Sequence, residues 1–266
     1  MIVLKIGGSV TGKYSESLVG DVKKHCLDEL IIVHGGGRVV DELSGKLGVK
    51  QKTYLSVSGF KTRLTDGETL DLIKMVFAGK INKEIVSILQ KHGLKAVGLS
   101  GVDGSLILAE RKKAVKIIDE RGRKRIIHDD LSGKPVKVNV DLLRLLTSSK
   151  YIPVIAPIGF SSEGLILNLD GDRVAARIAG EIGCEKLVIL TDVEGVIIDG
   201  KLVEFIGIDE LNKYMNMVFG GMKRKLLACG EALSLGVKEV VIASAVRENP
   251  LEKALHHFKC TVISGG

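Results

Sequence analysis

The sequence has little of what several protein classes require. Of its 266 residues none is tryptophan, only 4% are aromatic, and proline and cysteine each occur four times. The cysteines are scattered without a Cys-x-x-Cys pair, which disfavours a disulfide framework or a zinc site. Scarce proline argues against long disordered linkers. These absences predict a reduced, cytoplasmic, globular protein with an aliphatic core.

Membrane and nucleic-acid functions are also disfavoured. The chain starts on a short apolar strand that contains Lys5, unlike a signal peptide, and no later stretch is apolar enough to span a bilayer. The net charge of +7 would attract nucleic acid, but few aromatic residues are present to stack bases and no binding motif is recognisable. The charge instead indicates a lysine-rich thermophilic surface or an acidic partner.

Short β-branched runs alternate with amphipathic stretches, which is typical of an α/β protein with a mostly parallel sheet. The expected strands are 2–6, 30–34, 95–99, 152–156, 186–191, 239–243 and 261–263. The expected helices are 15–27, 38–47, 66–92 with a break near Gly79, 140–148, 170–182 and 222–235. Segment 105–138 differs, and its runs at 106–109, 115–118 and 125–128 predict antiparallel hairpins.

Two glycine-rich loops each follow an apolar strand. In Lys5-Ile6-Gly7-Gly8-Ser9, glycines let backbone N–H groups approach a phosphate, and the lysine adds positive charge. In His34-Gly35-Gly36-Gly37, the glycines precede a helix whose N-terminus attracts anions. Neither loop is a P-loop or a dinucleotide fingerprint. A structural turn explains the first loop equally well, and His34 itself is expected only to pack at its strand end.

Three further motifs lie in the second half of the chain. Asn168 and Asp172 flank a helix start that Asp170 is suited to cap, so one can hold a ligand while the other organises lysines. Thr191-Asp192-Val193-Glu194-Gly195 follows another apolar strand, where open α/β sheets place ligands. Gly220-Gly221-Met222-Lys223-Arg224-Lys225 starts a helix with three positive charges. This geometry suits a phosphate, although a solvated basic face is the ordinary alternative.

In this order the five motifs resemble those of the amino-acid kinase family, and within it the acetylglutamate kinase branch, over essentially the whole chain. Arg63 and the run Ala78-Gly79-Lys80-Ile81-Asn82-Lys83 strengthen the resemblance. It implies a three-layer α-β-α sandwich with an amino-acid substrate lobe at 1–165 and an ATP-binding lobe at 166–266. It also implies ATP as donor, Mg²⁺ held mainly by the nucleotide phosphates with no protein metal site, and a homodimer.

The resemblance also implies the role of each site residue. Lys5 and Lys225 would stabilise the transferring phosphoryl group, with Asp172 holding both lysines and Gly8 donating its N–H. The implied substrate-binding residues are Gly36, Gly37, Arg63 and Asn168, and Gly36 would also donate its N–H to the γ-phosphoryl. The implied ATP-binding residues are Lys5, Gly7, Gly8, Ser9, Thr191, Asp192, Val193, Gly195, Gly221, Met222 and Lys225. A carboxylate acceptor is already ionised at neutral pH, so positioning and positive charge replace a general base.

The substrate prediction depends on one departure and one charge pattern. Val102 replaces the lysine of the G-K-D-G run of acetylglutamate kinases. The basic residues in the substrate lobe are dense at Arg111, Lys112, Lys113, Lys116, Arg121, Arg123, Lys124, Arg125, Lys134 and Lys137, opposed only by Asp119, Glu120, Asp129 and Asp130. This looks like the kinases of carrier-mediated lysine biosynthesis, in which 2-aminoadipate, and in some relatives glutamate for arginine synthesis, is presented on a small acidic amino-group carrier protein. Complementary charge would steer such a carrier.

Two alternatives to the carrier-linked substrate remain open. One is a kinase of free N-acetylglutamate in arginine biosynthesis, which needs no docking surface for a carrier. The other is a nucleotide-binding sensor without catalysis. The presence of Lys5, Asp172 and Lys225 together argues against the sensor.

Overall fold

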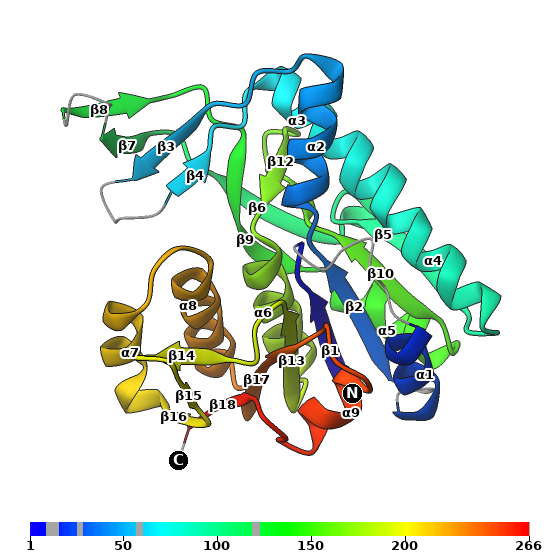
Figure 1. Cartoon of the computed structure of the whole chain (residues 1–266). Helices are drawn as coiled ribbons and strands as arrows, with labels where there is room; N and C mark the ends of the chain where they lie inside the picture. Colours follow the sequence, from blue (N-terminus) through cyan, green and yellow to red (C-terminus); the bar gives the residue numbers. More distant parts are fainter. Residues whose placement is uncertain (9–15, 26–28, 57–60, 119–122, 266) are drawn as a thin grey trace.

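The computed structural model describes residues 1–8, 16–25, 29–56, 61–118 and 123–265. An eight-stranded sheet forms its centre (Figure 1). In spatial order its strands are β16 (Phe205–Gly207), β18 (Thr261–Ser264), β17 (Glu239–Ser244), β13 (Lys186–Thr191), β1 (Ile2–Ile6), β2 (Leu30–His34), β10 (Ile152–Ala156) and β5 (Ala96–Ser100). Neighbouring strands pair in parallel except β17 and β18. The predicted mostly parallel sheet is therefore confirmed.

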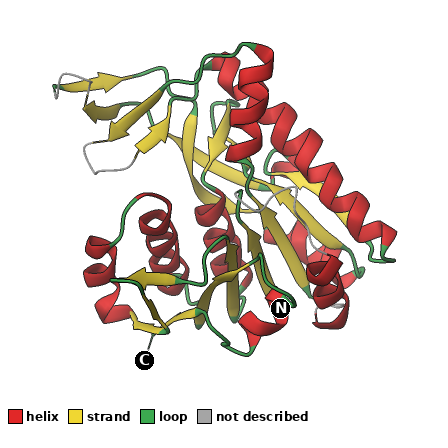
Figure 2. Ribbon diagram, in the orientation of Figure 1, coloured by secondary structure: helices red, strands yellow, loops and turns green. Residues whose placement is uncertain are grey.

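Helices cover both faces of this sheet (Figures 1 and 2). One layer contains α5 (Val140–Ser148), α6 (Gly171–Ile182), α7 (Leu211–Met217) and α8 (Gly220–Ser234). The other contains α1 (Glu16–His25), α2 (Gly37–Leu47), α3 (Gly67–Lys74), α4 (Asn82–Lys91) and α9 (Pro250–Leu255). Two helical layers form because successive side chains of a strand point to opposite faces of the sheet. Val3 packs into one apolar cluster and Leu4 into the other. This arrangement confirms the three-layer α-β-α sandwich.

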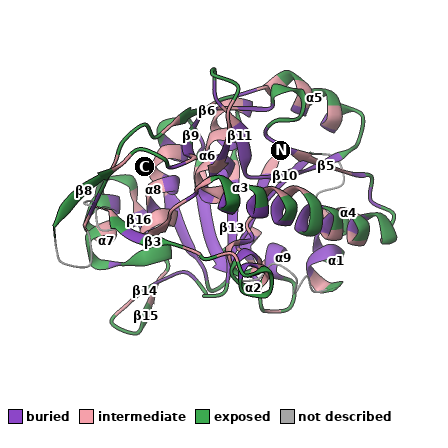
Figure 3. Ribbon diagram, turned by 90° about the horizontal axis from the view of Figure 1, so that it is seen from above, coloured by how far each residue is buried: buried purple, intermediate pink, exposed green. Residues whose placement is uncertain are grey.

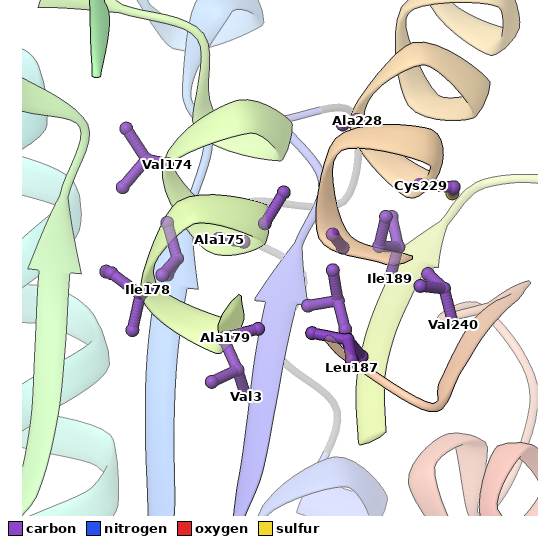
Figure 4. Close-up of a cluster of buried hydrophobic side chains, with 14 of the residues drawn as sticks. Val3, Val174, Ala175, Ile178, Ala179, Leu187, Ile189, Ala228, Cys229 and Val240 are labelled. Atoms are coloured by element: carbon purple, nitrogen blue, oxygen red, sulfur yellow. The ribbon is translucent and has the colours of Figure 1, made fainter. Parts of the chain in front are cut away.

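Figure 4 shows the cluster that holds α6 and α8 on β1, β13 and β17. Small residues of α6, Ala175 and Ala179, let the helix lie close to β1, while Leu187 and Ile189 fill the space beneath α8. Nearly all residues of the central strands are buried (Figure 3). A parallel strand that is buried on both faces needs apolar residues at nearly every position. Its sequence is therefore a continuous apolar run, which made these strands predictable.

Smaller sheets surround the centre. Strands β6 (Ile107–Arg111), β9 (Ser132–Val138), β11 (Ile158–Phe160) and β12 (Ile166–Leu169) close into a small barrel. Strands β3 (Thr53–Ser56), β4 (Lys61–Arg63), β7 (Val115–Ile118) and β8 (Lys124–Ile127) form a sheet that projects from the body opposite α8 (Figure 1). β14 (Val196–Ile198) and β15 (Lys201–Val203) form a hairpin. Antiparallel pairing of β7 with β8 confirms one predicted hairpin of 105–138. β6 pairs instead with β9, a strand outside the predicted runs, in a different sheet from β7.

The long helical stretch does not break at Gly79, contrary to the prediction. α3 continues into α4 through a π-helical segment, Met75–Ile81, and the helical backbone is not interrupted. Glycine costs a helix only about 1 kcal/mol, and this segment buries Val76, Phe77 and Ile81 in the core. The packing therefore outweighs the weak helix propensity of one glycine.

Local features at the helix and strand ends agree with the sequence in three places. Asp170 caps α6, accepting hydrogen bonds from the backbone N–H of Asp172 and Arg173 at 2.9 and 3.1 Å. His34 is fully buried at the end of β2. Gly220 opens α8 as expected.

The predicted ends of the first helix, residues 15 and 27, lie outside the described residues. No described helix is long and apolar enough to cross a membrane.

The central sheet joins the two predicted lobes, because β1 pairs with β2 on one side and with β13 on the other. The division at residue 165 therefore stays a prediction. Parallel pairing places the carboxyl ends of β1, β2 and β13 at one edge, with Ile6 opposite both His34 and Leu190. The loops that follow these strands meet at that edge.

Candidate active site

The two glycine-rich loops lie against each other at the carboxyl edge of the sheet. A Cβ added to Gly8 would lie 2.7 Å from the backbone nitrogen of Gly36, and one added to Gly35 would lie 2.6 Å from that of Gly8. Both separations are too short for any side chain, so the close approach of the two backbones requires glycine. The loops thus present backbone groups, rather than side chains, to whatever binds there.

A carboxylate flanked by two lysines lies beside the glycine loops. Asp172 Oδ1 is 2.5 Å from Lys5 Nζ, and Asp172 Oδ2 is 3.3 Å from Lys225 Nζ. Lys5 is only 4% exposed and Asp172 6%. Burial pushes the pKa of Asp172 upward, but the charges of Lys5 and Lys225 outweigh it and hold the pKa below its ordinary value. The carboxyl group is therefore ionised, and the three side chains of Lys5, Asp172 and Lys225 together carry a net charge of about +1.

Helices α6 and α8 bring this group together. Asp172 lies in the first turn of α6 and Lys225 in the second turn of α8. A forked ion pair joins the same two helices, since Arg173 Nε lies 2.9 Å and Nη2 2.5 Å from the two carboxylate oxygens of Glu231. This fork and the apolar cluster between the helices fix the distance from Lys225 to Asp172.

Three of the predicted substrate residues, Gly36, Gly37 and Arg63, meet at the start of α2, and the fourth, Asn168, lines the same cleft. Arg63, at the end of β4, donates to the carbonyl oxygen of Gly37 at 3.3 Å and forms an ion pair with Asp41. Asn168, near the end of β12, donates to the hydroxyl of Thr65 at 3.1 Å. The guanidinium therefore already has a carboxylate partner of its own chain, and a substrate carboxylate would have to compete with Asp41.

One cleft of about 1210 Å³ joins these groups. Its lining includes Lys5, Gly8, Gly36, Gly37, Arg63, Asn168, Asp172 and Gly221. Pockets for one small ligand usually measure about 300–1,000 Å³, so this cleft is large enough for two ligands in contact. It lies between the projecting sheet of β3, β4, β7 and β8 and the start of α8 (Figure 1).

Other residues predicted for the nucleotide lie beyond the lining of this cleft. They are Gly7, Thr191, Asp192, Val193, Gly195, Met222 and Lys225, while Ser9 lies outside the described residues. Gly195 has a packing reason to be glycine, because a Cβ there would lie 2.9 Å from the backbone nitrogen of Thr261. Thr191 ends β13, the neighbour of β1, so this segment lies at the same sheet edge. Its predicted contact with the nucleotide stays a prediction.

Sequence reasoning missed several polar groups of the cleft. Tyr54 lines it and donates to Asp130 Oδ2 at 2.7 Å. Lys112 and Arg224 line it as well. Desolvation by the walls of the cleft lowers the pKa of Lys112. The charges of Arg173 and Arg224 lower it further, and the charge of Asp130 opposes them. Single isolated residues of this kind leave no motif. The sequence flagged Lys112 as part of the basic region and Arg224 as part of the charge run of 223–225, but it assigned neither to the cleft.

The basic region divides into residues of the cleft and residues of the outer surface. Lys112 and Lys116 line the cleft. Arg111 donates to the backbone carbonyls of His128 and Asp130 at 3.0 and 3.1 Å, so it holds a loop. On β8 and just before it, Arg123, Lys124 and Arg125 are exposed. We call these three residues the outer basic surface; Arg121, Asp119 and Glu120 lie outside the described residues.

Two glycine loops in close backbone contact, two lysines paired with one buried aspartate and a cleft large enough for two ligands define the class: an α/β phosphotransferase. The sequence profile of the Amino acid kinase family matches residues 1–244, and the chain belongs to this family. Two solved structures share its fold. A Streptococcus mutans protein has a TM-score of 0.81 at 22% identity, covering 100% of this chain and 98% of its own. An isopentenyl phosphate kinase has a TM-score of 0.63 at 20% identity, covering 99% and 100%.

Closer relatives carry a more specific name. A Sulfolobus acidocaldarius protein named LysW-aminoadipate/LysW-glutamate kinase is 39% identical over 264 residues, which are 99% of this chain and 100% of that protein. A Saccharolobus islandicus protein of the same name is 38% identical over 266 residues, all of both chains. A Cenarchaeum symbiosum protein, assigned the same name by prediction, is 43% identical over the full length of both.

Proposed function

We propose that the protein transfers the γ-phosphoryl group of ATP to the side-chain carboxylate of 2-aminoadipate linked to an acidic amino-group carrier protein. Carrier-linked glutamate is the second substrate to be tested. The observation that carries the proposal is the group of Lys5, Asp172 and Lys225 beside the glycine loops. Lys5 and Asp172 line a cleft that has room for two ligands, and Lys225 pairs with Asp172. The names of relatives 38–43% identical over the full length support the choice of acceptor.

The reaction needs no proton transfer. A carboxylate oxygen attacks the γ-phosphorus, the bond from that phosphorus to the β,γ-bridging oxygen breaks, and ADP leaves with the electron pair. The products are an acyl phosphate and ADP. Charge spreads over three equatorial oxygens of the transferring group, where Lys5, Lys225 and the N–H groups of Gly8 and Gly36 would stabilise it. Asp172 stays ionised and keeps the lysines apart and in place.

The acceptor would lie over the start of α2. Gly36, Gly37, Arg63 and Asn168 bind its amino-acid part in this proposal, with the Arg63 fork taking a carboxylate. In the described structure Arg63 pairs with Asp41, which keeps the guanidinium in the cleft. An incoming carboxylate would take over part of this pairing, because a guanidinium offers five donors.

The nucleotide would lie on the side of α8. Gly7, Ser9, Gly221, Met222 and the segment 191–195 bind it in this proposal, and Mg²⁺ arrives with its phosphates and offsets their charge. Within the described part of the chain, no group of three or more His, Cys, Asp or Glu side chains is arranged to hold a metal ion.

A direct assay tests the acceptor. Purified protein is incubated with ATP, Mg²⁺ and either carrier-linked aminoadipate, carrier-linked glutamate or free N-acetylglutamate, and the acyl phosphate is trapped with hydroxylamine as the hydroxamate. The proposal requires the hydroxamate to form fastest on a carrier-linked acceptor. Hydroxamate formed only from free N-acetylglutamate would favour the alternative enzyme of arginine biosynthesis. Nucleotide binding without any hydroxamate would favour a sensor.

The outer basic surface would steer the acidic carrier to the cleft. Reversing Arg123, Lys124 and Arg125 to glutamate should lower kcat/KM for the carrier-linked acceptor about tenfold or more at low salt. The difference should shrink as salt rises, because exposed charges are screened over about 10 Å at 0.1 M. The matched control reverses three exposed residues in or next to α4, β5 and α5, elements that lie away from β8 (Figure 1), and changes the net charge equally; they are Lys91, Lys95 and Arg144. An equal loss in both variants would leave no role for the surface.

We also propose that the protein acts as a cytoplasmic homodimer with an amino-acid half at 1–165 and an ATP half at 166–266. Support for the dimer comes from the exposed apolar side chains of Leu47 and Met75 on helices of the first half. Light scattering that gives the mass of one chain would contradict it.

A further inference from the structure

His34 ends β2 immediately before the three glycines, and both of its ring nitrogens have partners. The residue is 0% exposed. Its Nδ1 lies 3.0 Å from the carbonyl oxygen of Gly35, and its Nε2 lies 3.4 Å from Nδ2 of Asn82. A carbonyl oxygen only accepts hydrogen bonds, so Nδ1 carries the proton and donates it to Gly35.

The amide of Asn82, also 0% exposed, has its orientation fixed from both ends. Its Nδ2 lies 2.8 Å from the carbonyl oxygen of Val154 and 3.3 Å from that of Leu99, which only accept. Its Oδ1 lies 3.1 Å from Nζ of Lys83, which only donates. The amide nitrogen therefore faces His34 and shares its two hydrogens among three acceptors, of which His34 is the most distant. Nε2 of His34 is then the unprotonated nitrogen of the ring.

The charge state of His34 agrees with this tautomer. Burial is the largest influence and outweighs the hydrogen bond to Gly35, and the charges of Lys5 and Lys83 act in the same direction as burial. Together they lower the pKa of His34 to about 4. At neutral pH the ring is uncharged, with one N–H and one lone pair, as the two hydrogen bonds require.

The Gly35 carbonyl belongs to the same peptide unit as the N–H of Gly36. The described residues contain no cis peptide bond, and in a trans peptide the carbonyl and the N–H point in opposite directions. A carbonyl held toward the His34 ring therefore aims the Gly36 N–H away from that ring. The nearby backbone is that of Gly8, whose added Cβ would lie 2.7 Å from the Gly36 nitrogen.

We propose that His34 and Asn82 are positioning residues that fix the Gly35–Gly36 peptide so that the Gly36 N–H points at the transferring phosphoryl group. The inference rests on the proposed function for its catalytic meaning. We call His34 and Asn82 together the His34–Asn82 relay. Asn82 anchors this relay to β5 and β10 through the carbonyls of Leu99 and Val154, so the peptide is fixed relative to the central sheet. Lys83 completes it by holding the Asn82 oxygen.

Substitutions at His34 separate hydrogen bonding from packing. H34N keeps an N–H donor near the place of Nδ1, whereas H34F keeps an aromatic ring against Phe77, its edge-to-face neighbour at 6.3 Å, without any nitrogen. One misplaced transition-state donor costs about 10²–10³ in rate. We expect kcat to fall about 10²-fold in H34F but about tenfold or less in H34N, with KM for ATP changed by less than about threefold in both. H92N, at the end of α4, is the control and should match the wild type.

Two further measurements keep the result interpretable. Titration with a non-hydrolysable ATP analogue counts competent sites, so a misfolded fraction lowers the stoichiometry rather than kcat per site. Nitrogen-15 NMR of the ligand-free wild type reads the tautomer directly, and the Nδ1–H form of His34 is expected. An Nε2–H tautomer, wild-type turnover in H34F, or equal kcat losses in H34F and H34N would each overturn the proposal.

The NMR measurement also separates this inference from the proposed function. If the wild type forms no acyl phosphate on any acceptor, the proposed function fails. The tautomer of His34, and a shift of the Gly36 amide resonance in H34F that is smaller in H34N, still show whether the relay positions this peptide.

Discussion

Replacing Asp172 by asparagine should destabilise the protein strongly, because it removes the carboxylate that pairs with both the buried Lys5 and the half-buried Lys225. With an effective dielectric constant of about 20, separations of 2.5 and 3.3 Å correspond to attractions of about 7 and about 5 kcal/mol. Desolvation of the buried charges cancels much of this. Removing one partner of a buried pair typically costs about 3–5 kcal/mol, which lowers Tm by about 6–20 °C in a chain of this size.

The assay compares D172N with D71N by thermal unfolding followed by circular dichroism. Asp71 pairs with Lys74 at 2.5 Å, but both side chains are exposed, so that pair is worth at most about 1 kcal/mol. D172N should melt much lower than D71N and should lose most of its kcat. A D172N protein that melts within about 2 °C of the wild type would refute the reasoning, since it would show that Lys5 and Lys225 tolerate each other without the carboxylate.

The same carboxylate predicts a pH dependence. Lys5 and Lys225 hold the folded-state pKa of Asp172 below its ordinary value of 3.8. Its contribution to stability is therefore fully present above pH 3.8 and is lost as the pH falls through the lower, folded-state pKa. The difference in unfolding free energy between wild type and D172N should be constant from pH 7 to about pH 5 and should shrink only in stronger acid. A difference that already collapses between pH 7 and 5 would contradict the depressed pKa.

Three further substitutions test the site. Lys5→Ala and Lys225→Ala should each lower kcat by about 10²–10³ with a smaller effect on ATP binding, and wild-type turnover in either would remove that lysine from the mechanism. Arg63→Lys should raise KM for the acceptor and leave ATP affinity nearly unchanged, because lysine keeps the charge but loses the fork; a fall in ATP affinity measured by calorimetry would place Arg63 with the nucleotide instead.

The central strands could be predicted from sequence because they are short, apolar and bounded by glycine or polar residues. Ile2–Ile6 and Leu30–His34 match their predicted ranges. The cap at Asp170 could also be predicted, because a cap depends only on residues two or three positions away. The four-residue spacing of Asn168 and Asp172 marked the place where the site forms.

Contacts between distant segments left no such signal. The π-helical segment at Met75–Ile81 depends on tertiary packing, which overrides the low helix propensity of Gly79. Lys112 reaches the cleft only because β6 ends beside it. Asn82 and His34 are 48 positions apart and meet through the fold, so reading each alone predicts nothing more than a buried polar residue. Long-range geometry, rather than composition, decides which polar groups act together.

The glycines of the second loop offer a matched test of that conclusion. A Cβ on Gly36 would press against the side chains of Ile81 and Phe77, 2.7 Å from a Phe77 ring carbon, whereas one on Gly37 meets nothing within 4 Å. Ile81 is fully buried and cannot move aside freely. G36A should therefore cost about 1–3 kcal/mol of stability and displace the peptide next to Gly8, lowering kcat. G37A should keep or slightly raise Tm, since alanine favours the helix by up to about 1 kcal/mol. If the two variants melt alike and turn over alike, the π-helical segment does not support the loop, and the sequence alone, in which these glycines look equivalent, would have been the better guide.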